Sequence, residues 1–188
     1  MLNLFREVFM RHKMQRKLGV VVNHRHMEMS AGERLVHYEK VATPWQIDAV
    51  PPAIANKLQG ATWAAVDGAL VPYELRLGSE TDGTRTDFPE GFASDLAAVL
   101  GSYGLADRLG VSALDDDDVI DSPSKLFECT MGRATVTMDE TPGEVGDEMI
   151  DVFWGFDDGQ EGSPIVPWRR CVRCCQLHGA KPKQLFEA

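Results

Sequence analysis

The dipeptide Asp67-Gly68 is the strongest turn signal in the chain and constrains its fold more than any other feature. It separates two apolar segments, 63–66 and 69–77, and Asp-Gly is a preferred sequence for the tight turn that joins two antiparallel strands. Residues 73–77 alternate between apolar and polar side chains, as in a half-buried strand. Because Pro72 has no amide proton, we expect this strand to lie at a sheet edge or to carry a bulge there.

The second half of the chain adds further strand-like segments and predicts an antiparallel meander. A second hairpin is expected around Gly132-Arg133, and two apolar runs follow it after polar loops. The segments are 125–131, 134–138, 149–156 and 164–168.

Helices are expected mainly in the first half. Residues 2–17 have the spacing of an amphipathic helix and 18–23 form a β-branched run that predicts the first strand. Thr43-Pro44 resembles a capped helix start. Further helices are predicted over 53–59, ending at Gly60, and over 90–103.

Together these patterns predict an α+β fold, with an antiparallel sheet of about five strands and two to four helices packed on it. The length of 188 residues suits one ordinary domain. We expect a basic N-terminal helix and first strand over 1–22, a single α+β domain over 23–170, and a basic tail containing cysteine and histidine over 171–188.

The net charge of −10 is unevenly distributed. Residues 1–26 carry six Lys and Arg against one Glu, and residues 169–183 carry five basic residues and no acid. The acidic centre argues against nucleic-acid binding over most of the surface, but the two basic ends keep a nucleic-acid partner as an alternative. The simplest interpretation is that the basic ends balance the acidic centre within the molecule.

The sequence predicts an intracellular protein, cytoplasmic or nuclear. No run approaches the roughly 18 apolar residues of a spanning helix. Three of the four cysteines are clustered, which is unlike a disulfide scaffold and favours a reducing compartment. A mitochondrial transit peptide is an alternative for residues 1–17, although this segment has no serine.

The densest chemical feature is the C-terminal cluster Cys171, Cys174, Cys175 and His178. Thiolate and imidazole are preferred zinc ligands, and Cys171-x2-Cys174 has the spacing of a zinc knuckle. Adjacent Cys174 and Cys175 side chains point apart, so one ion cannot readily take all four ligands. No second Cys-x2-Cys pair follows, so a zinc site here requires residues from elsewhere.

Remote ligands are available in His24, His26 and Cys129. Two histidines separated by one residue lie on the same face of an extended segment. Cys129 lies on a predicted strand, where it also fits as a small core residue. If the fold brings these residues to Cys171, a zinc ion would hold the C-terminal segment against the first strand.

No catalytic motif of a hydrolase, metalloprotease, P-loop or dinucleotide-binding protein is present in the sequence. The sequence therefore favours a non-enzymatic binding or regulatory protein with a protein partner and a zinc site. The competing hypothesis is an enzyme, most specifically a thiol oxidoreductase that uses Cys171 and Cys174, because nearby arginines enrich the reactive thiolate.

Overall fold

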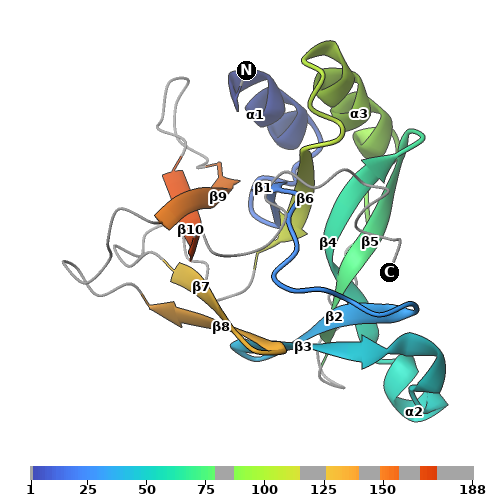
Figure 1. Ribbon diagram of the computed structural model, residues 1–188. Helices are drawn as coiled ribbons and strands as arrows, with labels where there is room; N and C mark the ends of the chain where they lie inside the picture. Colours follow the sequence, from blue (N-terminus) through green and yellow to red (C-terminus); the bar gives the residue numbers. More distant parts are fainter. Residues whose placement is uncertain (1, 79–86, 115–125, 140–148, 157–165, 173–188) are drawn as a thin grey trace.

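The computed structural model is a closed barrel of ten strands (Figure 1). It describes residues 2–78, 87–114, 126–139, 149–156 and 166–172. The strands are β1 Leu18–Val22, β2 Glu33–Tyr38, β3 Val41–Gln46, β4 Leu58–Val66, β5 Ala69–Leu77, β6 Leu109–Ala113, β7 Leu126–Met131, β8 Ala134–Asp139, β9 Met149–Gly155 and β10 Val166–Val172. The helices are α1 Leu2–Arg11, α2 Pro52–Ala55, α3 Phe92–Ser102 and the short 3₁₀ helix η1 Ile47–Ala49.

The order of strands around the barrel is β1-β6-β4-β5-β2-β3-β8-β7-β10-β9, and β9 returns to pair with β1. Most neighbours are antiparallel. Two pairs are parallel, β2 with β5 and β7 with β10. The antiparallel pairs β3–β8 and β1–β9 join the strands of the first half of the chain to those of the second half.

The hairpin predicted around Asp67-Gly68 is confirmed. β4 and β5 pair on either side of the turn, and both turn residues have the positive φ that this turn requires, 49° for Asp67 and 79° for Gly68. The irregularity expected at Pro72 is also present. Pro72 lies opposite Trp63 and Glu74 lies opposite Thr62, so β5 has one extra residue between them.

The prediction of a five-stranded α+β sheet was wrong. The Thr43-Pro44 helix signal lies within β3, where β8 pairs only with Val41 and Ala42, so Pro44 interrupts no ladder on that side. The helix expected over 53–59 is only α2, and β4 passes through Gly60. Barrel closure provides strand partners on both sides, and this tertiary pairing overrides the local helix preference.

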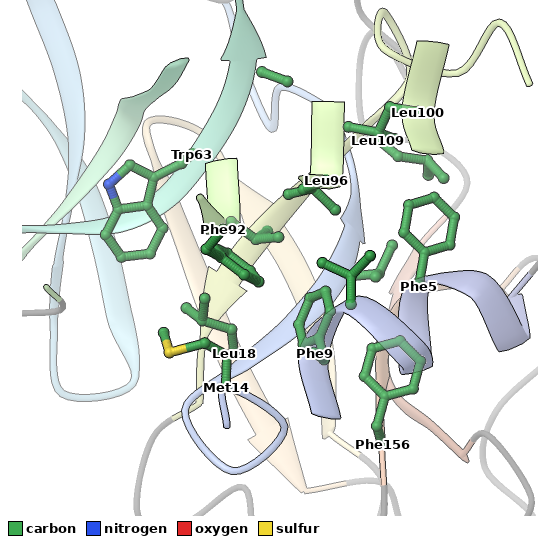
Figure 2. Packing of buried hydrophobic residues seen from close by; sticks show 14 of the residues in the cluster. Phe5, Phe9, Met14, Leu18, Trp63, Phe92, Leu96, Leu100, Leu109 and Phe156 are labelled. Carbon is green, nitrogen blue, oxygen red and sulfur yellow. The ribbon is translucent and has the colours of Figure 1, made fainter. Parts of the chain in front are cut away.

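Helices α1 and α3 lie together against the outside of the barrel (Figure 1). Both were predicted, although α1 ends at Arg11 and is shorter than the expected helix over 2–17. Figure 2 shows Phe5 and Phe9 of α1 facing Phe92 and Leu96 of α3, with Phe156 completing the cluster. Phe9 contacts Phe92 edge-on at 5.4 Å between ring centroids. No helix in the described part of the chain is long and apolar enough to cross a membrane.

The strands beneath these helices turn their large apolar side chains outward. Residues of β1, β6 and β4 that join the helical cluster include Leu18, Val20, Trp63, Ala65, Leu109, Val111 and Ala113. Because strand side chains alternate, the residues between them face the barrel interior. These are mostly small or polar: Gly19, Val21, Thr62, Ala64, Gly110 and Ser112. The barrel therefore has an apolar outer layer under the helices and room inside for polar groups.

We predict that Gly19→Ala destabilises the fold by about 2 kcal/mol, because the interior is closely packed at β1. A Cβ atom at Gly19 would lie 2.6 Å from the Trp154 carbonyl oxygen and 2.7 Å from the Phe153 ring. Gly101→Ala in α3 is the matched control, since its Cβ meets open space and should stabilise the helix by about 0.5 kcal/mol. Urea unfolding of both variants measures the difference. Equal stabilities would contradict the close packing at Gly19.

Candidate metal centre

His24 and His26 lie just after β1, where the chain leaves the barrel wall. The Asn23 amide still donates to the Arg108 carbonyl oxygen at 2.8 Å, which holds the start of this segment beside β6. Both histidine side chains are buried, and their rings meet edge-on with centroids 4.5 Å apart. The two imidazoles therefore lie together as the one-residue separation suggests, although the segment after β1 is not a strand.

Glu128 and Cys171 reach the same point from β7 and β10, which are three strands and two strands away from β1 around the barrel. β7 and β10 are parallel there, and Cys171 lies directly beside Glu128 in the register, so both side chains lie on the same face of the sheet. Both residues are buried, and the exposed fraction of Cys171 is 0%. Arg169, two positions before Cys171, has a guanidinium nitrogen 3.8 Å from Oε1 of Glu128.

The potential ligand atoms of His24, His26, Glu128 and Cys171 all lie within 4.8 Å of one another. Nε2 of each histidine is 3.6 Å from Oε2 of Glu128. On a tetrahedron with metal–ligand bonds of about 2.0–2.3 Å, the ligand atoms are about 3.3–3.8 Å apart. The two measured separations fit this geometry, and the widest pair needs to move closer by about 1 Å.

The tautomer of His24 is also suited to a metal. Its Nδ1–H donates to the Val22 carbonyl oxygen at 2.7 Å, which leaves Nε2 directed at Glu128. A backbone hydrogen bond of this kind commonly fixes the ring of a metal-bound histidine. Arg169 orients the Glu128 carboxylate in a similar way, because it interacts with Oε1 while Oε2 faces the histidines.

The ionisation states of His24 and Glu128 depend strongly on each other. Burial alone would lower the pKa of His24, but the nearby negative charge of Glu128 outweighs it and raises that pKa to about 9. Burial likewise opposes ionisation of Glu128, yet His24, His26 and Arg169 hold its pKa far below the usual range. At neutral pH a proton on His24 therefore balances Glu128, and a metal ion would take the place of that proton.

A second group of buried polar side chains, centred on Glu74, lies next to the potential metal ligands. Glu74 of β5 accepts hydrogen bonds from His37 Nε2 at 3.2 Å and from the Thr62 hydroxyl at 2.8 Å. Thr62 lies 3.4 Å from the Ser112 hydroxyl, so the chain of polar groups crosses β2, β5, β4 and β6. Despite burial, His37 lowers the pKa of Glu74 to about 2, and Glu74 raises the pKa of His37.

A pocket opens beside the histidines. Its wall includes His24 and His26 on one side and Tyr73 and Glu74 of β5 on another. Arg25 and Arg34 also line it. Burial and the positive charge of Arg34 both lower the pKa of Arg25, so the two guanidinium groups are near enough to interact.

The structure brings together three of the six predicted metal ligands, His24, His26 and Cys171. The other three, Cys174, Cys175 and His178, lie outside the described residues. Glu128 was missed, although its neighbour Cys129 was considered. Cys129 lies on the opposite face of β7, opposite Val136 of β8. The sequence offers one signal for Glu128, an acid between Phe127 and Cys129 in a predicted strand, which does not show that its side chain faces the interior.

Comparisons with known proteins show limited similarity. No family model matches the chain, and no solved structure matches it. A segment of 77 residues is 39% identical to part of a Glutamyl-tRNA(Gln) amidotransferase subunit of Endomicrobium trichonymphae. The match covers 41% of this chain and 14% of that relative, so the chain spans a small fraction of the relative's length.

We predict that Glu74→Gln destabilises the protein at pH 7 by about 3 kcal/mol, because it breaks a part-buried ion pair whose carboxylate is buried. Since folding lowers the pKa of Glu74 from 4.5 to about 2, its contribution is fully present above pH 4.5 and is lost as the pH falls toward 2. The difference between wild type and variant should therefore shrink over that range. Urea unfolding at several pH values measures it.

Asp139→Asn is the control for this experiment. Its carboxylate pairs with Lys40 at 3.2 Å, but both side chains are more than half exposed, so the change should stay within about 0.5 kcal/mol. A Glu74→Gln effect that is equally small, or that does not vary between pH 4.5 and 2, would contradict a stabilising Glu74–His37 pair.

Proposed function

We propose that this protein binds one zinc ion in its barrel interior through His24, His26, Glu128 and Cys171, and that it acts as a non-enzymatic binding or regulatory protein. The observation that carries the proposal is the convergence of these four side chains from the segment after β1, from β7 and from β10. All four are buried, and their ligand atoms lie within 4.8 Å of one another.

The chemistry of the ligand set favours zinc. Imidazole, thiolate and carboxylate are its ordinary protein ligands, and four protein ligands in a tetrahedron are typical of zinc sites that support a fold. The carboxylate of Glu128 and the thiolate of Cys171 together carry two negative charges, which neutralise a divalent ion in the interior. The histidines then bind as neutral ligands, and His24 releases its Nε2 proton while its Nδ1–H keeps the hydrogen bond to the Val22 carbonyl oxygen.

A buried ion-pair network is the main alternative explanation for these residues. Such a network accounts for His24, His26 and Arg169 around Glu128. It does not require a thiol at this point, although Cys171 also packs among Val21, Val152 and Phe153 as a small core residue does. The position of the Cys171 sulfur at the same point supports metal binding.

The burial of Cys171 also bears on the oxidoreductase hypothesis. A reactive cysteine needs an accessible thiolate, whereas the Cys171 side chain is fully buried and packs with Val21, Val152 and Phe153. This environment favours a held ligand over an exposed nucleophile, and we therefore prefer the zinc proposal.

The proposal predicts about one equivalent of zinc per chain in protein purified without a chelator or an affinity tag. Cys171→Ser and Glu128→Gln should each weaken zinc affinity by at least about 100-fold, since each removes a direct ligand. Competition with a chromophoric chelator measures the affinity, and elemental analysis gives the stoichiometry.

The informative control is a triple variant, Cys174→Ser, Cys175→Ser and His178→Ala. It removes the remaining sequence-predicted ligands of the C-terminal cluster and should leave zinc affinity within about threefold of wild type. If the triple variant loses the metal while Cys171→Ser and Glu128→Gln retain it, the barrel site is wrong. Less than about a tenth of an equivalent of zinc in the wild-type protein would also contradict the proposal.

A further inference from the structure

A row of apolar side chains crosses four neighbouring strands, β2, β3, β8 and β7. Tyr38 of β2 lies opposite Val41 of β3, and Val41 lies opposite Val136 of β8. Cys129 of β7 continues the row, opposite Val136. Because residues directly opposite each other in a sheet point to the same face, all four side chains lie on one face of the barrel wall.

The residues next to this row show that its face is the outer one. Ala42 and Thr135 follow and precede the row by one residue on β3 and β8, and both are buried. Glu128 of the proposed metal centre precedes Cys129 and is buried as well. The exposed fractions of Tyr38 and Val41 are 56% and 42%. Since side chains alternate along a strand, the apolar row points away from the barrel interior.

Two methionines widen the row into a patch. Met131 and Met138 lie two residues beyond Cys129 and Val136 on their strands, so they share the outer face. Met131 is 61% exposed. The residues of this sheet-face patch are Tyr38, Val41, Cys129, Met131, Val136 and Met138.

The sheet-face patch lies across the barrel from the helical layer. Helices α1 and α3 cover β1, β6 and β4, whereas β3, β8 and β7 occupy the opposite part of the strand order (Figure 1). Exposed apolar residues that are scattered singly are ordinary on a protein surface, but a contiguous group marks an interaction site. The arrangement of these six side chains therefore indicates a surface that binds a protein.

The charged residues at the two ends of the patch carry both signs. In the turn between β2 and β3, Lys40 pairs with Asp139 at 3.2 Å. In the turn between β7 and β8, Arg133 pairs with Glu33 at 2.6 Å. Glu39 adds one exposed acid to the first turn. Each end of the patch thus presents a cation together with an anion.

This border identifies the kind of partner. The chain has a net charge of −10, so two copies repel each other over most of their surface. A strongly basic partner would be matched by an acidic border, and a strongly acidic partner by a basic one. A border with both signs at each end fits a surface that has the same border, so either end can meet either end of a second copy.

We propose that the sheet-face patch is the interface of a homodimer in which the patches of two copies pack face to face about a two-fold axis. A two-fold interface uses the same surface on both chains and must be complementary to itself. An apolar centre with both charges at each end meets that requirement. Because Glu128 faces the interior and Cys129 faces outward, dimerisation does not depend on the proposed zinc site.

Sedimentation equilibrium of the full-length protein tests the proposal, in a reducing buffer that prevents a disulfide between Cys129 residues. The weight-average mass should rise toward twice the monomer mass between about 1 and 200 µM protein, as for a dimer with a micromolar Kd. A monomer over this whole range would overturn the proposal.

Val41→Glu and Met131→Glu each place a charge in the apolar centre and should weaken dimerisation at least about tenfold. Both positions are exposed in the monomer, so urea unfolding should show that the variants stay folded. Tyr103→Glu is the matched control, because Tyr103 is 46% exposed at the end of α3 and lies outside the patch. A dimer that persists in both patch variants, or that Tyr103→Glu weakens equally, would place the interface elsewhere and overturn the proposal.

Lys40→Glu tests the choice of a second copy as the partner. It leaves the apolar centre intact but makes one end of the patch wholly acidic on both chains. Dimerisation should weaken at least about fivefold at about 50 mM salt and approach that of wild type at about 500 mM salt, because salt screens exposed charges. Unchanged dimerisation at low salt would contradict an interface bordered by complementary charges.

Discussion

The buried carboxylate of Glu128 is the interaction on which the interior of this barrel depends. An ionised carboxylate away from water is costly unless charged and hydrogen-bonding groups surround it. Here His24 and His26 approach one oxygen and Arg169 approaches the other. These partners come from the segment after β1 and from β10, so satisfying one charge ties the first strand of the barrel to the last.

The arrangement of the barrel wall makes this polar interior feasible. Helices α1 and α3 cover the outer face of β1, β6 and β4, and the large apolar side chains of those strands point toward the helices. Glycine and small hydroxyl residues are left on the inner face, where β1, β6 and β4 lie side by side. The larger apolar cluster lies in the outer layer, and the interior holds the Glu128 centre and the Glu74–His37 pair beside a smaller apolar cluster that includes Val21 and Phe153.

The sequence predicted parts of this arrangement because they depend on local spacing. The turn at Asp67-Gly68, helices α1 and α3, and the shared face of His24 and His26 follow from short-range rules. Barrel closure does not follow from short-range rules. The parallel pairing of β10 with β7 joins residues about 40 positions apart and has no local pattern. Glu128 was missed for a similar reason. The alternation of side chains along β7 shows that Glu128 and Cys129 face opposite sides of the sheet, but it does not show which side is the interior.

The most direct measurement of the proposed metal centre is X-ray absorption at the zinc edge of the zinc-loaded protein. Coordination by His24, His26, Glu128 and Cys171 predicts one sulfur at about 2.3 Å and three nitrogen or oxygen atoms at about 2.0–2.2 Å. A first shell with two or more sulfur atoms would contradict the proposed centre, because it would place the ion on the cysteines that follow β10.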